Sequence, residues 1–152
     1  MAGEQQPVFN IEKLYVKDLS VEVPNAPGIY LEREAPQIDV NMSTENSALG
    51  EALYHASITV TATAKIGDKT MFLVECTQAG IFRIENVPQD QLPMVLGIGC
   101  PNIVFPYLRE TVSDVVIRAG FPPLLLNPVN FEALFLQQQQ AQQQQAAPAQ
   151  TH

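Results

Sequence analysis

The fold is decided by residues 54–82, which read YHASITVTATAKIGDKTMFLVECTQAGIF. Apolar and polar side chains alternate along residues 54–63 and again along residues 70–82, with the period of two that half-buried β-strands show. Threonine, valine and isoleucine recur in the first run, and β-branched residues favour strands. Between the runs, Ile66-Gly-Asp-Lys69 is typical of a tight turn. The stretch therefore predicts two antiparallel strands joined by a hairpin.

Two further strands are predicted upstream of this hairpin. Residues 9–22 alternate with period two, and the even spacing of Asp18 and Glu22 points both carboxylates to one side. Residues 38–42, IDVNM, predict a short half-buried strand, and the polar residues 43–50 a connection. Because no helix separates these runs, we expect one four-stranded antiparallel sheet whose apolar face needs a cover.

The second half of the chain is predicted to supply that cover with two helices. Residues 105–119 place apolar side chains at steps of three and four, and Gly120 with two prolines beyond it is a typical helix end. A last helix is predicted from Asn130, which can cap it, with Phe131, Leu134 and Phe135 on one stripe. The fold class is therefore α+β.

The two ends of the chain are predicted to lie outside the folded domain. Residues 137–145 contain eight glutamines and one alanine, and such a polar, low-complexity tract has nothing to bury. We expect a flexible N-terminus over residues 1–8, a single domain over residues 9–136, and a disordered or frayed tail over residues 137–152.

Two charge-free stretches, residues 92–108 and 119–131, are apolar and carry six prolines between them. We interpret the first as a loop that leads into the helix, because its prolines and glycines disfavour a helix, including one that spans a membrane. Such loops either cover the core or a subunit interface, or line a groove for apolar segments of another chain. Methionines, here Met71 and Met94, would let such a surface adapt to varied ligands.

Charge and composition narrow the function classes. The chain has 8 basic and 16 acidic residues, a net charge of −8, which argues against nucleic acid as a partner and favours a basic one. The two cysteines, Cys76 and Cys100, form neither a disulfide scaffold nor a CxxC zinc site, and free thiols suit a reducing cytosol. The N-terminus has neither the basic nor the apolar region of a signal peptide.

Catalytic chemistry has little support in the sequence. His55 lies among threonines on the polar face of a predicted strand, neither cysteine has a basic neighbour, and no phosphate-binding loop or hydrolase motif is present. We therefore predict that the protein is not an enzyme. Two alternatives stay open: an enzyme with Cys100 as nucleophile, and an assembly protein whose apolar loops are consumed in a homo-oligomer.

The sequence resembles the SecB family of bacterial protein-export chaperones from about residue 9 to residue 136. The likeness is carried by these segments, in this order: Tyr15-Val-Lys-Asp-Leu-Ser20, Val23-Pro-Asn-Ala-Pro27, Gly80-Ile-Phe82, Cys100-Pro-Asn-Ile-Val-Phe-Pro-Tyr107 with Arg109-Glu110, Gly120-Phe-Pro122 and Leu126-Asn-Pro-Val-Asn-Phe131. The sequence departs from the family at residues 33–36, which lack the tryptophan that often precedes the second strand, and in its glutamine-rich rather than acidic tail.

The resemblance implies a cytosolic chaperone without ATPase activity or cofactor. It would hold unfolded precursor proteins in apolar grooves and pass them to the SecA motor. It implies a four-stranded sheet packed on two C-terminal helices, assembled as a homotetramer, a dimer of dimers. The partner of the acidic face would be the basic, zinc-bearing C-terminal tail of SecA, with no metal bound by this chain.

Site residues are carried over by position from the family. The resemblance implies that SecA contacts Asp18, Glu22, Leu73 and Glu75. It places the client grooves near residues 83–104 and 130–142, and implies that they are lined by Ile38, Val40, Met42, Phe72, Met94, Cys100, Tyr107 and Phe135.

Overall fold

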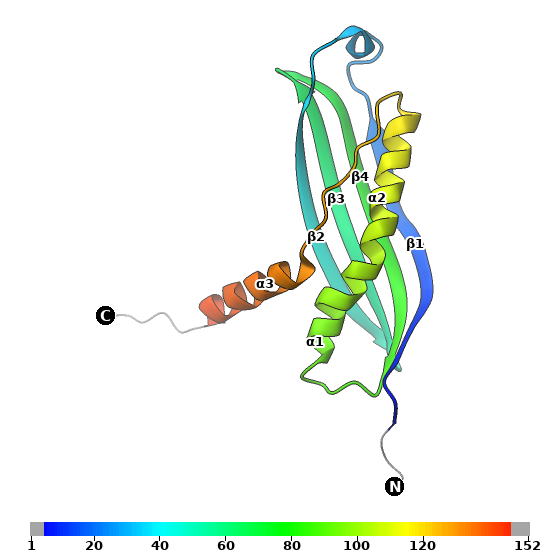
Figure 1. Ribbon diagram of the computed structural model, residues 1–152, viewed down its shortest axis with the longest axis vertical. Coiled ribbons are helices and arrows are strands. Elements are labelled where there is room, and N and C mark those ends of the chain that lie inside the picture. The colour runs from blue at the N-terminus through cyan, green and yellow to red at the C-terminus, as the bar shows by residue number, and fades with distance from the viewer. Residues whose placement is uncertain (1–4, 147–152) are drawn as a thin grey trace, which may run out of the picture.

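A single four-stranded sheet forms one layer of the molecule. The structure is a computed structural model that describes residues 5–146 (Figure 1). The strands are β1 (Val8–Glu22), β2 (Gln37–Gly50), β3 (Leu53–Ile66) and β4 (Lys69–Glu85). All neighbours pair antiparallel in the order β1-β4-β3-β2, so β1 and β2 are the edge strands. The predicted hairpin joins β3 to β4, with Gly67 in the left-handed conformation that its turn requires (φ 58°).

Both edge strands differ from the sequence prediction. Residues 43–50, predicted as a connection, continue β2 and pair with β3 as far as Gly50. This half of an edge strand is mostly exposed, so it carries no apolar alternation from which a strand could be recognised. In β1, two register shifts, at residues 11–13 and 16–18, break the strict alternation that was predicted for residues 9–22.

The main helix begins earlier than predicted. Residues 92–108 are not a loop: α1 (Leu92–Met94), the π-helical turn η2 (Val95–Gly99) and α2 (Cys100–Arg118) follow one another without a break. Pro93 and Pro101 each lie in the first turn of their helix, where a missing N–H costs little. Pro106 lies inside α2. The positions of Pro93 and Pro101 are why these two prolines, interpreted as helix breakers, did not prevent the helix, and α2 also continues through Pro106.

The end of α2 follows the prediction closely. Gly120 has a φ of 93°, its N–H donates to the carbonyl of Ile117 (2.9 Å), and the N–H of Phe121 donates to that of Val116 (3.2 Å). These two bonds are those of a Schellman motif, in which glycine ends the helix. The chain is thereby turned back along the molecule.

The core lies between α2 and the inward face of β3 and β4. One stripe of α2 is buried against the sheet: Cys100, Val104, Phe105, Leu108, Val112 and Val116. Phe82 and Val60 face it from the strands and are fully buried. Gln78 is the buried polar residue at this interface, and its side-chain oxygen accepts a hydrogen bond from the hydroxyl of Thr111 (3.3 Å). The sheet is covered on this face by helix, as predicted.

Residues 121–130 run back beside α2 as an extended segment, which we call the return segment (Figure 1). Its start is held by the Tyr30 hydroxyl, which donates to the Ala119 carbonyl (2.6 Å), and by stacking of the Tyr30 and Phe121 rings. Its middle is held by Arg109, whose Nε donates to the Leu126 carbonyl (3.1 Å). The segment is thus fixed along the molecule although it has no regular structure.

The last helix, α3 (Phe131–Ala146), begins at the predicted cap, where the Asn130 side-chain oxygen accepts the Ala133 N–H (3.0 Å). Phe131 is buried and meets the Phe105 ring edge-on. From there α3 points away from the sheet (Figure 1). The glutamine tract, for which a frayed helix end or a disordered tail was predicted, is helical through Ala146, and the rest of that predicted tail, residues 147–152, lies outside the described residues.

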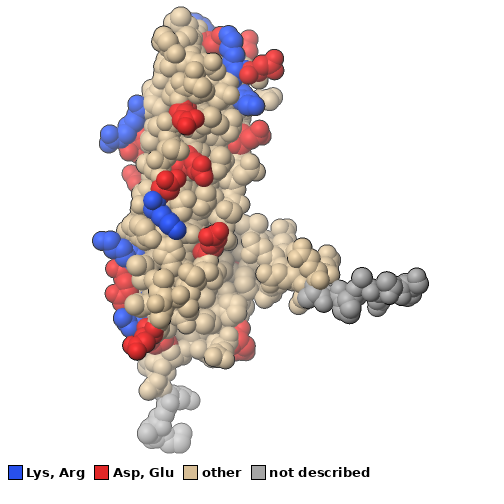
Figure 2. Space-filling view, turned by 180° about the vertical axis from the view of Figure 1, so that it is seen from behind, with Lys and Arg blue, Asp and Glu red and all other residues tan. Residues whose placement is uncertain are grey.

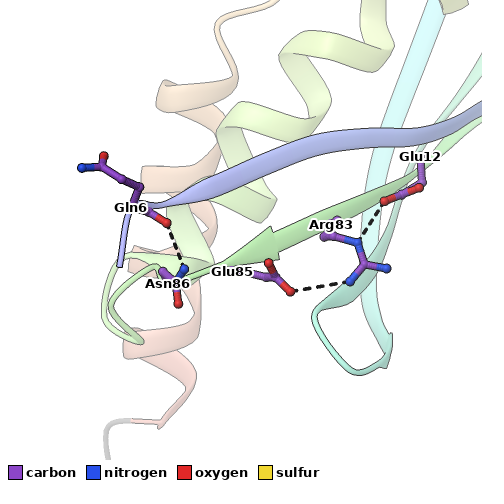
Figure 3. A network of polar contacts seen from close by, with 5 residues as sticks. All are labelled: Gln6, Glu12, Arg83, Glu85 and Asn86. Carbon is purple, nitrogen blue, oxygen red and sulfur yellow. Dashed lines mark hydrogen bonds and ion pairs between the residues drawn. The ribbon is translucent and has the colours of Figure 1, made fainter. Parts of the chain in front are cut away.

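The start of β1 is fastened to the end of β4 by polar contacts (Figure 3). The Arg83 Nε donates to the Glu12 carboxylate (3.0 Å), and a second guanidinium nitrogen lies 3.6 Å from Glu85. The Asn86 amide donates to the Gln6 carbonyl (2.9 Å). The edge strand is therefore held at its end by side chains as well as by the ladder.

The contact that orients α3 can be tested at Gly97. A Cβ at residue 97 would stand 2.5 Å from the Phe135 ring, whereas a Cβ at Gly99 would meet nothing within 4 Å. We expect Gly97→Ala to displace Phe135 and to speed amide hydrogen exchange in the first turns of α3 by about tenfold, the equivalent of roughly 1.4 kcal/mol. Gly99→Ala is the matched control, and equal exchange in both variants would contradict the assigned contact.

Candidate functional site

An apolar groove runs between β2 and the return segment. It consists of two adjoining depressions of about 420 Å³ and about 310 Å³, which share Ile38 and Leu124. The first is lined by Ile38, Val40, Met42, residues 124–129 and Leu134. The second is lined by Glu34, Pro36, Ile38, Met71, Phe72 and residues 121–124. The groove therefore follows a free sheet edge, with an extended, proline-rich wall on its other side.

Four of the predicted groove residues lie in this groove. Alternation along β2 points Ile38, Val40 and Met42 to the same side of the strand, and all three line the first depression. Ile38 and Val40 remain more than two-fifths exposed. Phe72 lies at the bottom of the second depression and is almost completely buried.

The structure places the other four predicted groove residues elsewhere. Met94 and Tyr107 are about half exposed on α1 and α2. Phe135 lies at the α3 contact with Gly97, next to Leu134 of the groove. Cys100 is fully buried in the core of the protomer, so its side chain lines neither depression.

Sequence reasoning named one wall of the groove and left out the other. The missing wall is the return segment, whose Leu124 to Val129 line the first depression. The charge-free run of residues 119–131 had been interpreted as either a cover of the core or a subunit interface or the lining of a groove, but none of its residues was named as a site residue. A third depression, of about 380 Å³, lies at the crossover after β4 and is lined by six residues between Ile84 and Leu92, which fall within the predicted range 83–104, together with Ala52 and Tyr54.

The opposite face of the sheet carries the predicted acidic residues in neighbouring rows. Glu22 of β1 lies opposite Leu73 of β4, and Leu73 lies opposite Thr63 of β3. In the next row Ser20 lies opposite Glu75, and in the third Asp18 lies opposite Thr77. Paired residues point to the same face of a sheet, so Asp18, Glu22, Leu73 and Glu75 form one surface, which we call the acidic face.

Within residues 5–146, no helix covers the acidic face. Figure 2, which views the molecule from behind, shows acidic side chains spread over a broad surface, with basic side chains among them and along its edges. The strands here carry small residues: Ser57 and Ala79 are buried in the row that also holds Tyr15, and the hydroxyls of Thr59 and Thr77 are hydrogen-bonded (2.9 Å). The result is a flat surface that a partner could approach closely.

His55 lies on this uncovered face, as predicted, and is not solitary. Its Nε2 is 2.6 Å from the Tyr15 hydroxyl, which reaches it across β4. Partial burial, with a smaller contribution from Lys17, lowers the pKa of His55 below its ordinary value. The imidazole is therefore neutral at neutral pH, and its hydrogen bond with the Tyr15 hydroxyl is a structural contact.

The two thiols are shielded. Burial raises the pKa of Cys100 to about 12, and burial with the charge of Asp18 raises the pKa of Cys76 to about 11. Nucleophilic cysteines need the opposite shift. Within residues 5–146, no three metal-ligating side chains come together, and no helix is both long and apolar enough to cross a membrane.

This shielding has a measurable consequence. A thiol reagent at pH 8 should leave both cysteines of the native protein largely unmodified and react with both once the chain is unfolded. Because both pKa values are raised above the 9.0 of an unperturbed thiol, stability is full below pH 9 and falls as pH rises toward 11. Rapid labelling of one native thiol would contradict the burial of that residue.

The sheet, its helical cover and the groove together define a class of protein. A sheet covered on one face, with an open apolar groove along a free edge, suits a protein that holds extended polypeptide, which is a chaperone. A family model described as preprotein translocase subunit SecB matches residues 2–143. The chain belongs to the SecB family of protein-export chaperones, and the resemblance noted in the sequence is confirmed.

Individual relatives agree with this assignment. The protein-export protein SecB of Thiobacillus denitrificans is 86% identical over the whole of both chains. That of Methylobacillus flagellatus is 61% identical and covers 99% of this chain and 96% of its own. The SecB-like chaperone of Mycobacterium tuberculosis, solved with a peptide of the HigA1 antitoxin, has a TM-score of 0.63. At 17% identity over 80% of this chain and 87% of that one, it supports the fold.

Proposed function

We propose that this export chaperone acts in the cytoplasm without ATP, holds unfolded precursor proteins in the groove between β2 and the return segment, and passes them to SecA. The observation that carries the proposal is the groove itself, because its walls are apolar and it remains open beside the edge strand β2, whose outer edge is unpaired. Neither thiol is set up for nucleophilic chemistry, so binding rather than catalysis is the activity we assign.

Binding in such a groove does not depend on the client's sequence. Each Å² of apolar surface removed from water contributes about 25 cal/mol, whichever apolar side chain supplies it. The free backbone edge of β2 offers further hydrogen bonds to an extended chain, again without reading side chains. Selectivity would be kinetic, since a chain that folds quickly hides its apolar segments first.

We propose that the protein assembles as a tetramer, a dimer of dimers. Two apolar surfaces of the protomer support this. The free edge strand β1 exposes Phe9, Ile11, Val16 and Leu19, and the outer side of α2 exposes Tyr107 and Ile117. Several grooves in one particle would bind one long client at several points, and the effective concentration would raise the affinity.

Release is proposed to follow from docking of SecA on the acidic face. The basic, zinc-bearing tail of SecA would meet Asp18, Glu22 and Glu75 around Leu73, and the zinc would belong to that partner. Because the acidic face and the groove lie on different parts of the protomer, client and SecA could be bound together. Handover would then need no nucleotide in this protein, only a stronger engagement of the client by SecA.

The groove is tested by two neighbouring substitutions in β2. Val40→Glu places a charge on the groove wall, whereas Asn41→Glu places the same charge on the opposite side of the strand. We expect Val40→Glu to weaken binding of an unfolded, slow-folding client by about tenfold or more, since the charge would be desolvated under the client. Asn41→Glu should bind as well as the unmodified protein.

The assay is suppression of client aggregation by stoichiometric protein without ATP, with the affinity read from a labelled client. If the unmodified protein suppressed no aggregation, the alternative of an assembly protein without clients would hold. If Val40→Glu and Asn41→Glu behaved alike, the groove would be wrongly placed. An activity abolished by thiol modification would favour the enzyme alternative at Cys100.

A further inference from the structure

Two of the methionines within residues 5–146 lie in the groove. Met42 stands half-buried in the wall of the first depression, and Met71 lies almost buried in the second. The third, Met94, is about half exposed on α1, outside both depressions. Of the two groove thioethers, that of Met42 is therefore the one open to small molecules from solvent.

The cysteines do not compete for an oxidant. Redox-sensing thiols are exposed and ionise easily, whereas Cys76 and Cys100 are fully buried and their pKa values are raised. A thioether has no such requirement, because its sulfur reacts without losing a proton. Of the two methionines in the groove, Met42 is thus the one whose side chain is more exposed to solvent.

We infer that Met42 is a reversible oxidation site, through which peroxide closes the first depression of the groove to apolar client segments. The inference rests on the proposed function of the groove. Hydrogen peroxide transfers one oxygen atom to the thioether: the O–O bond breaks, an S–O bond forms, sulfur loses two electrons, and the second oxygen leaves as water. Methionine sulfoxide reductases reverse the change with electrons from a thiol.

The surroundings of Met42 make it energetically unfavourable for a client segment to bury the sulfoxide oxygen. The wall of the first depression consists of Ile38, Val40, leucines 124–126, Pro128, Val129 and Leu134, and Asn127 is its single polar residue. A sulfoxide is a strong hydrogen-bond acceptor, and an apolar client segment brings no side-chain donor to it. Binding such a segment would strip water from the sulfoxide oxygen, and among the side chains that line the depression only that of Asn127 could donate a hydrogen bond in its place.

The test compares the full-length protein before and after treatment with hydrogen peroxide. Peptide mass spectrometry measures the sulfoxide at each methionine, and a labelled unfolded client measures affinity. We expect Met42 to be oxidised before Met71, and client affinity to fall about tenfold when Met42 is fully oxidised. Methionine sulfoxide reductase should restore it. Met42→Leu should keep its affinity through the treatment, whereas the control Met94→Leu should lose it as the unmodified protein does.

Three results would overturn the inference while leaving the groove in place: a Met42 that resists oxidation, an oxidised protein that binds client normally, or a Met42→Leu variant that loses affinity as strongly as the unmodified protein. A further comparison needs no oxidant. The Met42→Gln variant, whose side chain is polar, should bind client more weakly than Met42→Leu. Equal binding by these two variants would also contradict the inference. Failure of the proposed function is distinct, because the untreated protein would then not bind client at all.

Discussion

Replacing Leu108 by alanine should destabilise the protein by about 2–5 kcal/mol, the range measured when large core side chains are truncated. Leu108 lies in the middle of the buried stripe of α2 and is fully buried against β3 and β4. The surrounding side chains are held by a continuous helix on one side and a sheet on the other, so they can close only part of the cavity. The loss should appear as a lower midpoint in urea unfolding, with an unchanged slope.

Glu110→Ala is the matched control on the same helix. Glu110 is exposed two residues away, and alanine is at least as good a helix former, so its effect should stay within about 0.5 kcal/mol. Both variants must be measured at one protein concentration, because assembly of subunits adds to apparent stability. Equal destabilisation by the two would mean that α2 does not pack as described.

The strands of the hairpin and the end of α2 could be predicted because local chemistry decides them. Alternation along residues 54–63 and 70–82 reflects one buried and one uncovered face, and Gly120 ends α2 by a local motif. The extension of β2 through residues 43–50 could not be predicted. An edge strand there is specified by its pairing with β3, and its own side chains are exposed on both faces.

The prediction of a loop over residues 92–108 was wrong because the effect of a proline on a helix depends on its position. At Pro93 and Pro101 the missing N–H falls in a first helical turn, and nothing in the sequence marks the π-helical turn between them. That Asp18 and Glu22 lie on one side of the sheet could be predicted because they share one phase of the strand, and the register places them beside Leu73 and Glu75. The groove required the position of the return segment, which only tertiary contacts to Tyr30 and Arg109 determine.

Glu75→Lys should weaken binding of the SecA tail by about tenfold or more at low salt, if the acidic face is its docking site. Glu75 is exposed in the row between those of Leu73 and Thr77, so a lysine there would oppose a basic partner within the reach of Asp18 and Glu22. The measurement is titration of the tail, with zinc bound, into the assembled protein. Because exposed charges are screened, the difference should shrink at 0.5 M salt, where the Debye length falls to about 4–5 Å.

Glu51→Lys separates a local effect from one of net charge. Glu51 is exposed in the turn between β2 and β3, at the end of the sheet away from Leu73, and its reversal changes the net charge by the same two units. It should therefore leave tail binding nearly unchanged. Both variants should also hold an unfolded client as the unmodified protein does, because neither residue lines the groove. If Glu75→Lys lost client and tail binding together, the groove and the acidic face could not be separate surfaces, and handover would have to proceed by direct competition between client and tail.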